Sequence, residues 1–188
     1  MKLVCLAISC LSLLISIGCH RSPQRQTQSV TASSSVTPEN YPSLAARTKE
    51  ITDAFTNKDY QKVLDLTFPK VIEAGGGRDK MMVTMQKEIK GMETDGVVML
   101  STTAASPTNF VHDAGSIYAV VPISMKMKAQ NGVYQTEGTL IAISSDGGIN
   151  WTFIDAAGED DKDLTVLPGN VLSKLKLLAE KPPVKVAG

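Results

Sequence analysis

The sequence predicts an α+β domain in which helices come first and an antiparallel sheet follows. Two kinds of spacing support this class. Between residues 41 and 92, apolar residues recur every three or four positions, as on one face of an amphipathic helix. Between residues 116 and 155, apolar and polar residues alternate, as along a strand with one buried face. Glycine-containing turns separate the alternating runs, which predicts paired antiparallel strands.

Residues 1–19 form a targeting segment in front of this domain. Their apolar run is shorter than the ~20 residues that a membrane-spanning helix needs. The run ends in Ser16-Ile17-Gly18-Cys19, which resembles the lipobox of bacterial lipoproteins. The resemblance implies cleavage before Cys19 and attachment of diacylglycerol to this residue. An ordinary signal peptide, cut near Gly18 or Ser22, is the alternative interpretation.

All three cysteines, Cys5, Cys10 and Cys19, lie in the targeting segment. The predicted folded part therefore has no disulfide, cysteine nucleophile or cysteine ligand. Residues 20–40 are rich in Ser, Thr, Gln and Pro, which predicts a disordered tether behind the lipid anchor. The chain has 19 basic and 19 acidic side chains and no basic patch with interleaved aromatic residues. We therefore expect a membrane partner, reached through the lipid anchor, and no nucleic-acid partner.

Three helices are predicted before the sheet. Pro42 suits the first turn of the first helix, and Asp59 suits the N-cap of the second, residues 60–67. Pro69 begins a short turn that ends at three glycines, and Asp79 then opens the third helix, residues 80–92. The glycines lack the preceding strand and the Gly-Lys-Ser/Thr ending of a phosphate loop, so no phosphate site is predicted. We interpret the face of the third helix that carries Met81, Met85, Ile89 and Met92 as core, with an adaptable binding surface as the alternative.

The predicted sheet begins with two short strands, residues 97–101 and 110–113. In the next strand every second residue from Ile117 to Met127 is apolar, which gives one continuous apolar face. The other face ends in Lys126 and Lys128, which we expect to project into water. Pro122 cannot donate a ladder hydrogen bond, so an edge, a bulge or a bend is expected there. Asn131-Gly132 predicts the hairpin turn into a strand of residues 133–144.

A second turn joins this strand to the next, residues 150–155. Its sequence, Ser144-Ser145-Asp146-Gly147-Gly148-Ile149-Asn150-Trp151, resembles the Asp-box, Ser-x-Asp-x-Gly-x-x-Trp, which sialidases repeat on the blades of a propeller. One copy in 188 residues is too little for a propeller of ~40–50 residues per blade. We therefore expect a structural turn, in which the Asp146 carboxylate accepts N–H groups and Trp151 packs beneath.

The C-terminal part carries weaker signals. Residues 158–163 are acidic but lack the spaced Asp residues and the distal Glu of a calcium loop, so a solvated loop and no metal site are expected. A short helix is predicted over residues 172–178, and the tail, residues 181–188, is expected to fray. Residues 41–180 thus form the single predicted domain.

The order of elements, helices and then a long antiparallel sheet, resembles the nuclear transport factor 2-like superfamily over residues 41–155. The segment Asn57-Lys58-Asp59-Tyr60 also resembles the start of the second helix in such domains, and a cystatin-like domain would give a similar order. The resemblance implies a curved sheet wrapped over helices into a cone. It implies an enzyme, such as an isomerase or dehydratase, or a non-catalytic binding module. No catalytic, cofactor-binding or metal residue carries over by motif.

Three functions fit this sequence. The first is a membrane-anchored lipoprotein of the bacterial cell envelope, facing the periplasm or the exterior, whose domain binds a small ligand or a protein without catalysis. The second is a small cone-pocket enzyme, an isomerase or hydrolase, for which Asp65, Tyr118 and His112 are the polar candidates. The third is a structural role in the envelope. A deep apolar cavity with converging polar side chains would favour the enzyme.

Overall fold

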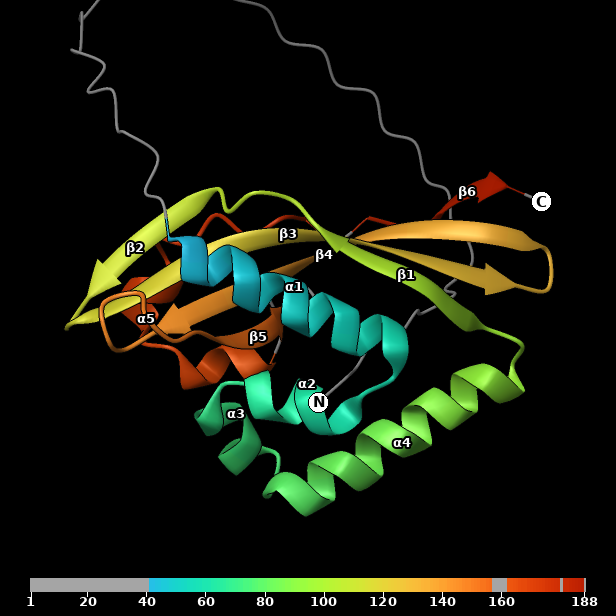
Figure 1. Cartoon of the computed structure of the whole chain (residues 1–188), viewed down its shortest axis with the longest axis horizontal. Coiled ribbons are helices and arrows are strands. Elements are labelled where there is room, and N and C mark those ends of the chain that lie inside the picture. Colours follow the sequence, from blue (N-terminus) through green and yellow to red (C-terminus); the bar gives the residue numbers. More distant parts are fainter. Residues whose placement is uncertain (1–40, 157–161, 180, 188) are drawn as a thin grey trace, which may run out of the picture. The chain divides into compact units, whose positions relative to one another are not determined.

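The computed structural model of the protein describes residues 41–156, 162–179 and 181–187 (Figure 1). The expected targeting segment with Cys19, the expected tether and residues 158–161 of the expected acidic loop lie outside the described residues. Within the described ranges, no helix is long and apolar enough to cross a membrane. The elements in chain order are α1 (Pro42–Asn57), α2 (Tyr60–Leu66), α3 (Pro69–Ala74), α4 (Arg78–Thr94), β1 (Val98–Ala104), β2 (Asn109–Asp113), β3 (Ser116–Ala129), β4 (Gly132–Ser144), β5 (Thr152–Ala156), η1 (Lys162–Val166), α5 (Gly169–Leu172) and β6 (Val184–Ala187).

The predicted α+β class is confirmed. Four helices precede an antiparallel sheet of six strands, in the order β1-β3-β4-β5, with β2 also paired to β3 and β6 to β4. Strands β3 and β4 are the longest, at 14 and 13 residues, and form one hairpin that runs through the sheet. The alternation read in the sequence therefore belongs to the central strand pair.

Pro122 lies within the central strand β3 and not at an edge of the sheet. Strand β2 pairs with residues 116–120 of β3, and β1 pairs with residues 123–128. Between them, the carbonyl of Pro122 accepts the N–H of Ala105 at 2.9 Å. The proline thus lies where the neighbour of β3 changes, and its missing N–H faces the β1–β2 connection, so no ladder hydrogen bond is lost.

The first hairpin turn lies one residue earlier than predicted. Ala129 pairs with Gly132, so the turn residues are Gln130 and Asn131. Gly132 begins β4 with φ 138°. A Cβ atom at Gly132 would lie 2.5 Å from the carbonyl oxygen of Ala187 in β6. The glycine is therefore needed for the close approach of the C-terminal strand, in addition to the turn.

Both faces of the central strands are buried at one end of the sheet. Ile117, Ala119 and Val121 of β3 face α1 and pack in one cluster with Leu44 and Ile51. The alternate residues of β3 pack on the opposite face of the sheet, against Leu164 of η1 and Val171 of α5. At the far end of β3, Lys126 and Lys128 are exposed, as predicted.

Helix α4 is one turn longer than predicted and packs unevenly. Its N-cap is Gly77, and Asp79 lies in its first turn. In its N-terminal half, Met81 and Met85 are each 2% exposed. In its C-terminal half, Ile89 and Met92 are only half-buried. This second half of the helix therefore leaves apolar surface next to the sheet, which positions the site described below.

The C-terminal segment differs from the sequence prediction in two places. The last helix, α5, ends at Leu172, where the predicted helix began. Within the tail that we expected to fray, Val184–Ala187 form β6, which pairs with residues 133–135 of β4. Strand β5 pairs only with residues 139–143 of β4, so the backbone groups of the first part of β4 are left for another strand. The C-terminal tail pairs with them as β6.

Candidate functional site

The three polar residues of the enzyme hypothesis do not come together. Asp65 lies on α2, where its carboxylate pairs with Arg78 at 2.7 Å. His112 lies exposed on β2 and is paired in register with Ile117, whereas Tyr118 is 7% exposed and paired with Val111. Neighbouring strand residues point to opposite faces, so His112 and Tyr118 lie on opposite faces of the sheet. The structure therefore provides no shared acid–base centre from these residues.

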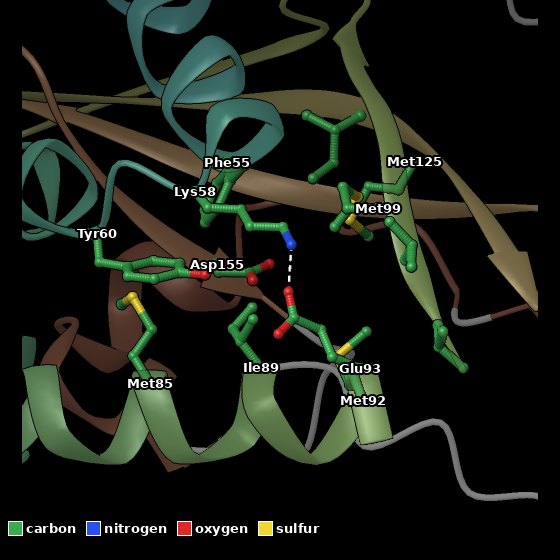
Figure 2. A pocket seen from close by; sticks show the side chains of 13 residues that line it. Phe55, Lys58, Tyr60, Met85, Ile89, Met92, Glu93, Met99, Met125 and Asp155 are labelled. Atoms are coloured by element: carbon green, nitrogen blue, oxygen red, sulfur yellow. Dashed lines mark hydrogen bonds and ion pairs between the residues drawn. The ribbon is translucent and has the colours of Figure 1, made fainter. Parts of the chain in front are cut away.

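A pocket lies elsewhere, between the C-terminal half of α4, the end of α1 and strands β1 and β3. Its enclosed part has a volume of only about 40 Å³, and the rest of the hollow opens to solvent. Four methionines line it, Met85 and Met92 from α4, Met99 from β1 and Met125 from β3, and we call it the methionine pocket. Figure 2 shows Met85, Ile89 and Met92 rising from α4 toward Met99 and Met125 on the strands.

The walls of the methionine pocket combine an apolar surface with conformational freedom. Thioether side chains are unbranched and polarizable, so they adapt to ligands of different shape. Met85 and Met125 are anchored in the core at 2% and 8% exposure, whereas Met92 and Met99 are half-buried at the open side. The sulfur atom of Met99 accepts a hydrogen bond from the Thr102 hydroxyl at 3.7 Å. The pocket therefore has a fixed floor and movable side chains near its opening.

An ion pair crosses the opening of the pocket. Lys58, the C-cap residue of α1, donates to the Glu93 carboxylate near the end of α4 (Figure 2). The hydrogen bond to Glu93 raises the pKa of Lys58. Lys58 is held at φ 58°, a conformation that side-chain-bearing residues seldom adopt. The left-handed cap thus ends α1 and points the ammonium group toward α4.

Two further polar side chains face the interior. Tyr60 begins α2 and Asp155 lies on β5, and both line the methionine pocket (Figure 2). Burial raises the pKa of Tyr60, so its hydroxyl is protonated at neutral pH. Asp155 also lines a second hollow, which adjoins the methionine pocket and shares Phe55 and Met85 with it. These polar groups lie beside an otherwise apolar surface.

Sequence reasoning identified only part of this site. The methionine face of the third predicted helix was noted, with core as the preferred interpretation, and its N-terminal half is indeed core. Met99 and Met125 gave no separate signal, because alternating apolar residues are what any half-buried strand carries. Lys58 was noted only as part of a polar turn.

The second turn of the sheet, residues 144–150, is held by hydrogen bonds among its own residues. Asp146 Oδ1 accepts the backbone N–H groups of Ile149 at 3.1 Å and Asn150 at 2.9 Å. The Ser144 hydroxyl donates to Asp146 Oδ1 at 2.8 Å and accepts the Gly148 N–H at 2.9 Å. Hydrogen bonds from the backbone and side chain of Asn150 are the main causes that lower the pKa of Asp146 to about 2. Both oxygens of the Asp146 carboxylate therefore accept hydrogen bonds from residues of the turn.

We expect this turn to make the stability of the domain pH-dependent. The pKa of Asp146 is about 2 in the folded chain, against 3.8 for an unperturbed side chain. The ionised carboxylate therefore contributes its full share of folding stability above pH 3.8, and this stability is lost as the pH falls toward 2. Wild-type protein should therefore melt higher than Asp146→Ala at neutral pH, and the gap should close over that acidic range. Melting curves followed by circular dichroism at several pH values test this. Asp53→Asn, on the exposed surface of α1, is the control, and a gap that is independent of pH would contradict the assignment.

Two further kinds of site were considered in the sequence, a phosphate loop at the three glycines and a metal site. The amide groups of Gly75, Gly76 and Gly77 donate to carbonyls of α3, so they serve its C-terminus. In the part of the chain that the structure describes, no three His, Cys, Asp or Glu side chains gather closely enough to hold a metal ion. No family model matches the chain, and comparison with the curated proteins and with the solved structures found no match.

Proposed function

We propose that this domain is a non-catalytic module that binds a small apolar ligand in the methionine pocket. The observation that carries the proposal is the lining of that pocket, in which four methionines and several aliphatic side chains surround a hollow that opens to solvent. A concave, mostly apolar surface with a few polar groups is the usual form of a small-molecule site. The separation of Asp65, Tyr118 and His112 supports binding over catalysis.

We also propose that the domain has the cone-like architecture of the nuclear transport factor 2-like superfamily. Two features support this proposal. Helices precede the antiparallel sheet in the same order, and the pocket lies between a helix and the sheet, where the cone of such domains opens. A fold of this type is compatible with many functions, so the ligand is argued from the pocket alone.

The binding proposal is tested with a neutral fluorescent dye, N-phenyl-1-naphthylamine, added to the purified domain, residues 41–188. Transfer of the dye from water into an apolar pocket should raise its emission, with saturation at one dye per chain. Unlabelled 1-decanol should displace it, because both compounds would occupy the same apolar space. Absence of saturable binding to a domain with a native circular dichroism spectrum would rule out the proposal.

The anchoring of the protein is a separate proposal that depends on Cys19. A single acyl chain binds membranes only marginally, whereas two or more hold a protein stably. We therefore expect the full-length chain to be recovered in the membrane fraction of the bacterial envelope. Replacing Cys19 by serine should shift it to the soluble fraction or leave an uncleaved precursor.

Cys10→Ser is the matched control, because Cys10 lies inside the apolar run and should not be lipidated. That variant should stay in the membrane fraction, and mass spectrometry should find diacylglycerol on its N-terminal Cys19. Recovery of the wild-type chain as a soluble protein without lipid would contradict the anchor.

A further inference from the structure

We infer that one face at the hairpin end of the sheet lies against the surface of an anionic phospholipid bilayer. This face, which we call the lysine face, consists of Ser101, Lys126, Lys128, Val133, Gln135 and Val184. The inference goes beyond the proposed function, because it concerns how the domain meets a membrane and not what the methionine pocket holds.

The strand register places the lysine face on one side of the sheet. Residues directly opposite each other in an antiparallel pair point to the same side. Lys126 lies opposite Ser101 of β1 and opposite Gln135 of β4. Gln135 in turn lies opposite Val184 of β6. Lys128 is two residues further along β3, so its side chain points to the same side as that of Lys126.

The lysine face is the uncovered part of a side that is core elsewhere. Tyr118 and Val120 lie on the same side of β3 and pack there against residues of η1 and α5. Figure 1 shows α5 at the other end of the sheet from the turn between β3 and β4. At the hairpin end, Lys126 and Lys128 are exposed and Val184 is 63% exposed. This end of the sheet is therefore available to a second surface.

The charge of the lysine face is positive. Lys126 and Lys128 form no ion pair with any residue that the structure describes, and the other four members of the face are uncharged. The next carboxylate along β4, that of Glu137, pairs with Lys181 at 2.9 Å. Two lysines without acidic partners on one open face complement an anionic surface.

The domain as a whole carries a net negative charge. Residues 1–40 contain three of the 19 basic side chains and one of the 19 acidic ones, so residues 41–188 contain 16 basic and 18 acidic ones. An anionic surface therefore repels the domain on average and attracts it only through a local cationic face. Contact with the bilayer would thus orient the domain with its hairpin end toward the lipid.

The composition of the lysine face favours a bilayer over a protein partner. Protein interfaces are enriched in aromatic residues and arginine and depleted of lysine. The six members of this face include lysine and valine but no aromatic residue and no arginine. Cationic and aliphatic side chains together suit the boundary between head groups and acyl chains. The lipid anchor proposed at Cys19 would hold the face close to a membrane, where a weak attraction is sufficient.

Sedimentation with vesicles tests this inference. The purified domain, residues 41–188, is mixed at low ionic strength with vesicles of phosphatidylglycerol and phosphatidylcholine in equal parts, or of phosphatidylcholine alone. We expect the domain to sediment with the anionic vesicles only, and added salt should release it, because salt screens the attraction. The double variant Lys126→Glu/Lys128→Glu should lower the partition coefficient by at least about tenfold, since each lysine near an anionic surface contributes to binding.

Helix α4 offers a matched control. Lys87 and Lys90 are exposed on this helix, so Lys87→Glu/Lys90→Glu makes the same change in net charge at another place. This variant should sediment with the anionic vesicles as wild type does. Circular dichroism melting of both double variants establishes that they are folded.

Three results would overturn the inference. The first is no sedimentation with anionic vesicles, which would favour an acidic protein as the partner of this face. The second is equal sedimentation with both kinds of vesicle. The third is an equal loss of binding in the two double variants, which would mean that net charge and not the lysine face determines binding. Each result leaves dye binding by the methionine pocket untouched, so the inference and the proposed function can fail separately.

Discussion

Replacing Trp151 by alanine should lower the free energy of unfolding by about 3–5 kcal/mol, the usual loss for a buried aromatic side chain. Trp151 is the single tryptophan of the chain and is 2% exposed. Its ring packs edge-on to Tyr41, with ring centroids 5.4 Å apart. Its indole N–H donates to the Gly148 carbonyl and to the Ser43 hydroxyl, each at 3.1 Å. Loss of the ring would therefore remove contacts that join the second turn to the start of α1.

A stability of ~5–15 kcal/mol is typical of a folded domain, so this change removes a large share of it. Urea unfolding followed by circular dichroism measures the loss, since the variant has no tryptophan fluorescence. Trp151→Phe keeps an aromatic ring and removes the indole N–H, so it should cost clearly less than alanine. Equal stability of Trp151→Ala and wild type would show that the turn and α1 are held together without this ring.

Filling the methionine pocket should abolish most of its ligand binding without unfolding the domain. Met92 lies half-buried on α4 at the open side of the pocket, where a larger ring would occupy space that a ligand needs. We expect Met92→Trp to weaken binding of N-phenyl-1-naphthylamine by at least about tenfold, the loss of roughly 1.4 kcal/mol of apolar contact. Fluorescence titration, with a melting curve for the same sample, measures both properties.

The same helix offers a matched control. Val83 is 65% exposed on the opposite side of α4, so Val83→Trp adds the same ring outside the pocket. This variant should bind the dye as wild type does. Equal binding by Met92→Trp and Val83→Trp would mean that the dye lies somewhere other than the methionine pocket.

The central strands of the sheet could be predicted because the patterns that specify them lie within short, continuous stretches of sequence. Alternation from Ile117 to Met127 set the faces of β3, and the glycine-containing turns set its pairing with β4. The helix α2 was predicted with its N-cap, and the Asp59 carboxylate accepts the N–H of Lys62 at 3.1 Å. The turn that begins at Ser144 was predicted for the same reason, since its hydrogen bonds lie within seven consecutive residues.

The candidate site could not be predicted, because its parts meet only after the helices pack on the sheet. Met85 and Met125 lie in a helix and in a strand that are far apart in sequence, and each has the pattern of an ordinary core residue. Tyr118 was a candidate for catalysis as one of three available polar side chains, and it lies on the face of β3 opposite α1. That face is covered by η1 and α5, and η1 begins at Lys162, inside the acidic stretch that was expected to be a solvated loop. The strand β6 depends likewise on its partner in β4.

The methionine methyl groups provide the most direct test that a ligand occupies the pocket. The chain has eight methionines, and four of them line the proposed site. With ¹³C-labelled methyl groups, titration of the domain with N-phenyl-1-naphthylamine should move the resonances of Met85, Met92, Met99 and Met125 together, with one common dissociation constant. Met82 also lies on α4 but does not line the pocket, so its resonance should stay in place. Saturating dye that leaves these four resonances unmoved, or moves only Met82 and Met127, would contradict the account.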